Sequence, residues 1–342
     1  MVTILGLTAL AFLGMAFLSS DEGETSELAG DDVADPSNEN SDDVLDSFLD
    51  MGPPDIHFPM HGSAVWVNGE SESYSASDLP QDLGETDFIT ITDASGSDEV
   101  DVSGIKNSIV YSGEGDTVVG SDAAGDEVVF VSISTGGALV VGGDSDGVFM
   151  SDGDGDTIMG EGGDDLIIGG NGISCLDGGE GDDTIYSSNE SYFVPTGTVS
   201  VNHLSDESMD TLSGGMGDDL LYLGDGDEAF GGSGADTFVS LGLEVVLADF
   251  EWGLDQLQVP ILGVEVLGDA SPNMPWAVSE HFSLEQTADG LALTLDNSTI
   301  AHLPNSENPS VAFQFNTDAE GVLYSIDGGT PIANASIVIT IY

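Results

Sequence analysis

The sequence almost lacks positive charge. Its 342 residues include a single Lys or Arg, Lys106, against 64 Asp and Glu, and the formal net charge is −63. Such a chain repels nucleic acid and anionic membrane surfaces, so we exclude nucleic acid as a partner. It also repels itself, and we therefore expect a compact state to need bound cations.

Cysteine and the common catalytic motifs are nearly absent as well. Cys175 is alone, which excludes an intramolecular disulfide and leaves the redox compartment open. No H-E-x-x-H motif occurs, so the zinc proteases that carry it are excluded. One G-x-S-x-G match, Gly143–Gly147, lies within a glycine-aspartate repeat instead of between a strand and a helix, where a hydrolase needs its nucleophile. We therefore predict no catalytic residues.

The chain is instead rich in a nine-residue phrase of glycine and aspartate. Copies at Gly178–Tyr186, Gly214–Tyr222 and Gly231–Val239 follow the pattern G-G-x-G-x-D-x-U-x, where U is a large apolar residue. Glycine permits turns through positive φ and brings backbone carbonyls close together. Carbonyl and carboxylate oxygens are hard ligands that suit calcium. The last three residues of each copy predict a very short strand whose middle side chain points inward.

The phrase resembles the repeat of the RTX, or haemolysin-type calcium-binding, family. The resemblance implies an all-β fold, a parallel β-roll (β-solenoid) in which two nonapeptides form one coil and residues 18 apart stack. No half-coil can bury its apolar residue alone, so the coils must stack. The resemblance also implies that several Ca²⁺ ions hold the loops of successive coils together. The implied metal ligands are Asp156, Asp165, Gly178, Gly179, Gly181, Asp183, Asp210, Gly214, Gly215, Gly217, Asp219, Gly231, Gly232, Gly234 and Asp236.

The repeat keeps its phase over a long stretch. In steps of nine, the predicted inward residues are Ile158, Ile167, Leu176, Ile185, Leu212, Leu221, Phe230 and, one residue early, Phe238. The interruption at 187–204 is 18 residues long and leaves this register intact. We interpret it as a loop insertion extruded from one coil. The alternative, two degraded repeats, is disfavoured because Val201 would replace the aspartate.

Each coil has an acidic position on both of its sides. On one side the positions one coil apart are occupied by Asp165, Asp183, Asp219 and Asp236. On the other side the equivalent residues are Asp156, Ser174, Asp210 and Glu228. Because Ser174 interrupts the second series, the first series is favoured as the calcium side.

A weaker form of the repeat begins near Thr86. Val100, Ile109 and Val118 are the predicted inward residues, but the glycine pairs are mostly missing. We expect this part to belong to the same solenoid, which then spans residues 86–240. Its coils should be held together by apolar stacking more than by calcium.

The N-terminal 20 residues are apolar and are predicted to form a short helix. Residues 2–18 carry no charge, and the run is just short of the usual transmembrane length of roughly 18 residues or more. It also lacks the basic n-region of a signal peptide. A membrane anchor and an atypical signal both remain open, so membrane association through residues 2–18 is one expectation. Residues 21–85 are acidic, contain prolines and are predicted to be a disordered linker.

Beyond Val239 the repeat stops, and residues 241–342 are predicted to form a β-rich C-terminal cap. The segment Asp249–Leu257 resembles one that often follows RTX repeats, and its apolar residues are suited to cover the end of the last coil. These residues are Phe250, Trp252 and Leu257. Alternation predicts further strands, the first two as a hairpin, at 291–295, 299–301, 311–315, 322–326 and 335–342.

The resemblance implies a secreted or cell-surface bacterial protein that folds on binding extracellular calcium. It further implies export by type I secretion machinery and a structural or adhesive role, with an adhesion partner that the sequence does not identify. The alternative is a calcium-stabilised extracellular enzyme, for instance one acting on polysaccharide. Only the C-terminal 100 or so residues have room for its catalytic domain, and they contain no recognisable catalytic constellation.

Overall fold

The computed structural model describes part of the compact unit Ser41–Tyr342. The residues that it describes are 73–74, 89–92, 99–102, 108–113, 115–120, 129–133, 136–151, 153–170, 172–188, 191–193, 200–204, 208–262, 282–295, 298–304, 311–315, 323–325, 331–332 and 335–341. Within these ranges every regular element is a β-strand and no helix occurs. The expected all-β fold is therefore confirmed for this part of the chain.

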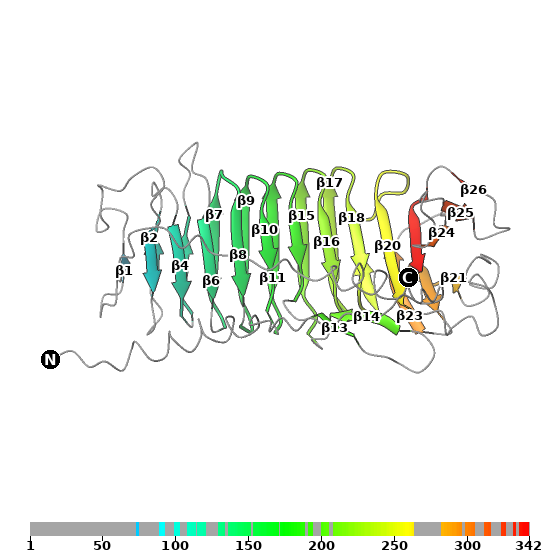
Figure 1. The fold of residues 1–342 in the computed structure, drawn as a ribbon, viewed down its shortest axis with the longest axis horizontal. Coiled ribbons are helices and arrows are strands. Elements are labelled where there is room, and N and C mark those ends of the chain that lie inside the picture. The colour runs from blue at the N-terminus through cyan, green and yellow to red at the C-terminus, as the bar shows by residue number, and fades with distance from the viewer. Residues whose placement is uncertain are drawn as a thin grey trace, which may run out of the picture. The chain divides into compact units, whose positions relative to one another are not determined.

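Two parallel sheets face each other, and successive strands alternate between them (Figure 1). The first sheet contains, in order, β1 (Ser73–Tyr74), β3 (Glu99–Asp101), β5 (Thr117–Val119), β7 (Leu139–Gly143), β9 (Thr157–Gly162), β11 (Cys175–Glu180), β15 (Thr211–Met216), β17 (Glu228–Ser233) and β19 (Val245–Leu247). The second contains β2 (Ile89–Thr92), β4 (Ser108–Ser112), β6 (Val129–Ile133), β8 (Gly147–Ser151), β10 (Leu166–Ile168), β12 (Thr184–Tyr186), β16 (Leu220–Leu223), β18 (Thr237–Ser240) and β20 (Gln256–Leu262). One strand from each sheet makes one coil, so the chain forms a parallel β-solenoid.

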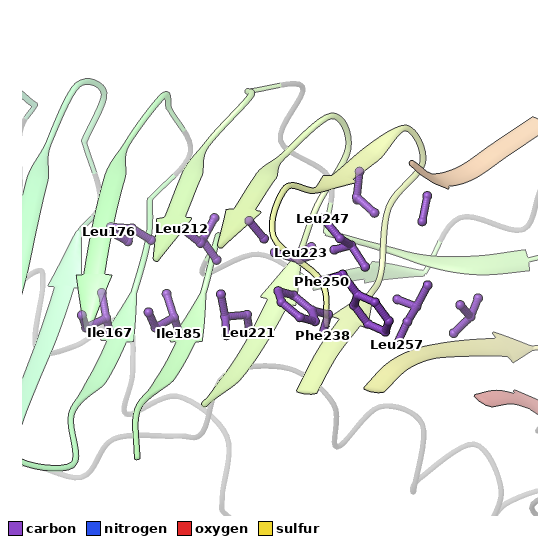
Figure 2. Packing of buried hydrophobic residues seen from close by; sticks show 14 of the residues in the cluster. Ile167, Leu176, Ile185, Leu212, Leu221, Leu223, Phe238, Leu247, Phe250 and Leu257 are labelled. Atoms are coloured by element: carbon purple, nitrogen blue, oxygen red, sulfur yellow. The ribbon is translucent and has the colours of Figure 1, made fainter. Parts of the chain in front are cut away.

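The core lies between the two sheets, as columns of apolar side chains in register (Figure 2). Ile158 pairs with Leu176, and Leu176 pairs with Leu212, along the first sheet. Along the second sheet the matching column is Ile167, Ile185, Leu221, Phe238 and Leu257. All these side chains are fully buried. Because each such burial contributes about 1.5–3 kcal/mol, stacking of the coils supplies the apolar driving force that one coil lacks.

The prediction that Phe230 points inward is wrong. The structure pairs Leu212 with Ala229, which is fully buried, while Phe230 points outward and is 36% exposed. Inward residues are nine apart from Ile158 to Leu176, but Leu221 and Ala229 are only eight apart. The turn between β16 and β17 is thus one residue shorter, and a one-residue slip moves a strand's side chains to the other face. The same slip explains why Phe238 follows one residue early.

The weaker repeats do belong to the solenoid. Val100 and Val118 are fully buried in the core, as predicted. On β4 the core position is Val110 and not Ile109, since Val110 is in register with Val131 and belongs to the core cluster. The first sheet already includes β1, which lies inside the range 21–85 assigned to a linker. At the other end the coils run past residue 240 to β20.

The insertion leaves the stacking of the coils intact, although Ser187 and Ser188, which were assigned to it, are buried in the coil. The strands on either side of it pair directly, β11 with β15 and β12 with β16. Its own strands, β13 (Ser191–Phe193) and β14 (Ser200–Leu204), pair antiparallel, and β14 also pairs with β20. At the junction the rings of Tyr186 and Tyr222 stack with centroids 4.2 Å apart. The strands before and after the insertion therefore continue the two sheets in register.

The C-terminal region extends both sheets. The first sheet ends in the antiparallel strands β21 (Phe282–Gln286), β22 (Gly290–Leu295) and β23 (Ser298–Pro304), with β23 beside β19. The second ends in β24 (Val311–Phe315), β25 (Leu323–Ser325), β26 (Pro331–Ile332) and β27 (Ile337–Ile341), with β27 beside β20. Phe250 packs against Phe238 and against the edge of Trp252, with ring centroids 5.8 and 5.0 Å apart. The predicted hairpin is confirmed, and Phe250 belongs to the core cluster, while the strands β23 and β27 continue the sheets beyond the last coil.

The N-terminal predictions lie outside the described residues. They concern the helix at 1–20, membrane association through residues 2–18, and the linker at 21–85 apart from β1. In the part of the chain with a described structure, no helix has the length and apolar character needed to cross a membrane.

The corrected register can be tested with the two phenylalanines of neighbouring strands. Replacing the fully buried Phe238 by alanine should lower the free energy of unfolding by about 3–5 kcal/mol, because it leaves a cavity in the core. Phe230→Ala, on the outer face, should change it by about 0.5 kcal/mol or less. Denaturant unfolding of both variants decides the point. Equal losses would contradict the register.

Candidate metal centre

Each coil has two connections, which lie at opposite edges of the solenoid. Connections from the first sheet to the second carry the first column, which we define as Asp165, Asp183, Asp219 and Asp236. Connections from the second sheet to the first carry the second column, which we define as Asp116, Asp156, Asp210 and Asp227. The predicted ligands Asp156 and Asp210 thus lie at the edge opposite to the others. Asp227 is the equivalent of Asp210, whereas the sequence predicted Glu228. The cause is again the turn between β16 and β17, which is one residue shorter.

A backbone-to-carboxylate ladder stacks the first column. The N–H of Asp165 donates to Asp183 Oδ1 at 2.8 Å, and that of Asp183 donates to Asp219 Oδ1 at 2.8 Å. Asp219 donates in the same way to Asp236 at 3.1 Å, across 17 residues. The ladder begins at the N–H of Gly147 and ends at Asp255. Each carboxylate therefore uses one oxygen to hold the preceding coil, and the aspartates stack one coil apart as the spacing predicts.

The second oxygen of each first-column carboxylate has no partner. Oδ2 of Asp165, Asp183, Asp219 and Asp236 is buried without a hydrogen bond, and each residue is at most 2% exposed. Buried polar groups are normally satisfied, and leaving one unpaired costs about 1–3 kcal/mol, or more for a charged group. Asp255 closes the column differently, because its Oδ2 accepts the N–H of Glu251 at 2.7 Å. Four consecutive coils thus present an oxygen that lacks a positive partner.

The first glycine of each repeat makes room for that oxygen. A Cβ placed on Gly178 would lie 2.1 Å from Asp183 Oδ2, closer than real contacts allow. A Cβ on Gly214 would lie 2.2 Å from Asp219 Oδ2 and 2.7 Å from the carbonyl oxygen of Gly231, in the next coil. The missing Cβ therefore leaves a space bordered by a carboxylate and a backbone carbonyl from adjacent coils. Gly160, which the sequence interpretation missed, stands in the same relation to Asp165 and to the Gly178 carbonyl.

The later glycines of the repeat let successive connections approach closely. Gly181, Gly217 and Gly234 have φ of 140°, 137° and 146°, which a residue with a side chain rarely adopts. A Cβ on Gly217 would lie 1.8 Å from the Gly181 carbonyl oxygen. The connections therefore stack carbonyl oxygens beside the carboxylates. The predicted oxygen-rich environment is present at this edge.

An outer ladder of exposed aspartates reinforces the same connections in the opposite direction. Oδ1 of Asp164 accepts the N–H of Asp182 at 2.9 Å, and Oδ1 of Asp182 accepts the N–H of Asp218 at 2.8 Å. In the buried ladder a later coil accepts from an earlier one, whereas here an earlier coil accepts from a later one. Each Asp-Asp pair therefore clamps its connection to both neighbours. The doubled aspartate was visible in the sequence, but its second role was not predicted.

Burial raises the pKa of every first-column carboxyl. Desolvation, helped by neighbouring carboxylates, raises the pKa of Asp165 to about 8 and that of Asp219 to about 7, although a backbone N–H bond to each acts the other way. The pKa values of Asp183 and Asp236 are raised to about 6 for the same first cause. Without a cation, part of this column is therefore protonated at neutral pH.

The second column has donors for both carboxylate oxygens. Asp156 accepts the Ala138 N–H on Oδ1 at 2.9 Å and the Ser151 hydroxyl on Oδ2. Asp210 accepts the Ser174 N–H on Oδ1 at 2.6 Å and the Ser208 hydroxyl on Oδ2 at 3.3 Å. Both edges of the solenoid thus carry aspartates at coil spacing, but the hydrogen bonding of these aspartates differs.

The donor set indicates what kind of cation the first column suits. Among the residues whose placement is described, no group of three or more His, Cys, Asp or Glu side chains converges on one point. A cation there would be held by two carboxylates and backbone carbonyls, all of them oxygen donors. Zinc prefers four nitrogen or sulfur ligands, and calcium takes six to eight oxygens, so this column fits calcium better than zinc.

Comparison of the chain with protein-family models, with curated proteins and with solved structures gives no match. Metal ligation by the predicted residues therefore stays a prediction, supported by the geometry of the first column.

The raised pKa values predict how the calcium-free fold responds to pH. A carboxyl whose folded pKa lies above its unfolded value of about 3.9 stabilises the fold below that value, and this stability is lost as pH rises through the folded pKa. With folded pKa values of about 6 to 8, the thermal midpoint should fall between pH 5 and pH 8.5. Asp165→Asn should flatten the slope, whereas Glu285→Gln, an exposed carboxyl, should not. An equal slope in Asp165→Asn would contradict the assignment.

Because each first-column Oδ2 lacks a partner, we predict that one substitution stabilises the fold without calcium and destabilises it with calcium. In Asp219→Asn the amide oxygen can keep the bond from the Asp183 N–H, while the unpaired oxygen is replaced by an N–H₂ group near the Gly231 carbonyl. Without calcium the variant should be more stable than the unaltered chain by about 1–3 kcal/mol. With calcium it should be the less stable of the two. Chemical denaturation under both conditions measures this, and the exposed neighbour Asp218→Asn, which should show neither effect, is the control.

Proposed function

We propose that this chain is a calcium-binding β-solenoid of the RTX type whose fold is completed by calcium outside the cell. The observation that carries the proposal is the first column, where four buried carboxylate oxygens, one coil apart, lack any partner. In a chain of net charge −63, burying four carboxylates without partners costs free energy, and bound cations would offset this cost.

The repeat residues divide the work of holding the ions. First-column aspartates supply carboxylate oxygens from two adjacent coils. The glycines at 178, 179 and 181, and their equivalents at 214, 215, 217, 231, 232 and 234, supply backbone carbonyls and the space that a Cβ would fill. Bound calcium supplies the positive charge that these oxygens lack and links successive coils.

Calcium of this kind is a folding ligand. Extracellular sites typically bind with Kd of about 10⁻⁴–10⁻³ M, so a chain that depends on them is only marginally stable at cytosolic calcium levels and completes its folding after export. Each ion stabilises the folded chain by about 2.7 kcal/mol at a hundredfold excess over Kd. This logic supports a secreted or surface location, with a type I exporter as the route.

The role that we propose is structural or adhesive. The solenoid presents long sheet faces and carries no recognised catalytic motif. No observation on the described residues favours the alternative of a calcium-stabilised enzyme acting on polysaccharide.

Calcium-dependent folding is tested by circular dichroism of the full chain. β-structure and the thermal midpoint should both rise as calcium is added to chelator-treated protein, with saturation near millimolar concentrations, in the range typical of extracellular sites (about 10⁻⁴–10⁻³ M). Magnesium at the same ionic strength is the control for general charge screening. Identical spectra and midpoints with calcium and with chelator would sink the proposal.

A further inference from the structure

We propose that calcium binds along one edge of the solenoid only, and that the opposite edge is closed by the protein's own hydrogen-bond donors. This inference rests on the proposed function and assigns the ions to the first column alone. Both edges carry aspartates at coil spacing, and the hydrogen bonding of their second oxygens distinguishes the edges more sharply than the interruption at Ser174 does.

In the second column both carboxylate oxygens of Asp156, Asp210 and Asp227 are hydrogen-bonded within the protein. In Asp227 the Oδ1 accepts the N–H of Asp210 at 2.9 Å, and the Oδ2 accepts the N–H of Gly224 at 2.6 Å. In Asp116, Oδ2 accepts both the Gly113 N–H at 2.5 Å and the Ser112 hydroxyl at 3.4 Å. A calcium ion there would have to displace bonds that are already made, whereas in the first column it would displace none.

The second column is also interrupted. Asp156 lies between coils that carry Ala138 and Ser174 at the equivalent positions, as the backbone bonds Thr157 N to Ala138 O and Cys175 N to Asp156 O show. Ser174 turns its hydroxyl to the Gly172 carbonyl at 3.3 Å. Asp210 and Asp227 are therefore the one pair of second-column carboxylates in adjacent described coils, and the oxygens of both are bonded.

The first column is continuous and has defined ends. Gly147 occupies the position before Asp165, so no carboxylate precedes the column in that coil. At the other end Asp255 has both oxygens bonded, to Asp236 and Glu251 N–H groups. The four aspartates with a free Oδ2 leave three intervals between them, 165/183, 183/219 and 219/236, which sets the expected number of ions at about three.

Two isosteric variants of the full chain separate the edges. Asp219→Asn alters two of the three intervals of the first column, while Asp210→Asn alters the second column. In each variant the amide oxygen can keep the backbone bond that Oδ1 accepts. Calcium binding is measured by isothermal titration of chelator-treated protein. Asp219→Asn should lose most of the bound ions, and Asp210→Asn should retain the number and bind within twofold of the unaltered affinity.

Hydrogen exchange gives a second readout that does not depend on fitting a binding curve. On adding calcium, amide protection should rise in peptides covering the first-column connections, such as 181–183 and 217–219. Peptides covering 208–210 and 224–227 should gain no more protection than the amides of β11, which serve as the reference for the general gain in stability.

The outcomes are distinguishable. Loss of ions in Asp210→Asn, or an equal gain of protection at both edges, overturns the one-edge assignment while calcium binding by the chain stands. Absence of calcium binding in the unaltered chain overturns the proposed function and this inference together. Retained stoichiometry in Asp219→Asn overturns the assignment of the ions to the first column.

Discussion

The cost of burying carboxylates in a chain of net charge −63 governs this structure. A solenoid cannot stack its coils without taking the residues of its connections out of water, and here those residues are aspartates. One oxygen of each aspartate accepts a backbone N–H from the neighbouring coil, which ties the coils together. The other oxygen must be satisfied separately, and how this happens decides the character of each edge.

The two edges solve this problem differently. At the second edge, serine hydroxyls and backbone N–H groups reach the remaining oxygens, so the connections close with protein atoms alone. At the first edge, each Oδ2 lies close to where the Cβ of a glycine would be, and no donor reaches it. The apolar columns between the sheets are continuous throughout, so packing alone does not distinguish the edges. The first edge is consequently where the chain can respond to a cation.

Periodicity was a reliable guide wherever the coil length stayed constant. Ile158, Leu176 and Leu212 lie inward as a nine-residue step predicts, even across the insertion, because a loop of whole coil length preserves the phase. The prediction failed at Phe230, where a turn shortened by one residue turned the strand over, and at Ile109, where no glycine pair marked the phase. The length of each turn depends on local backbone geometry, and a regular nine-residue pattern does not show where one turn is shorter.

The sequence by itself determined the solenoid and its stacked aspartates, because an apolar residue every nine positions can be buried only by stacking coils. It also places a glycine five residues before each first-column aspartate. Only the tertiary structure decided which oxygens have partners, because Asp183 and Asp210 are each followed by a threonine and a buried apolar residue and yet differ in their hydrogen-bond donors. The Ser208 hydroxyl that serves Asp210 comes from the connection left by the insertion, and Asp183 has no such donor among the described residues. A hydrogen bond depends on where donors lie in space, and repeat spacing carries no record of that.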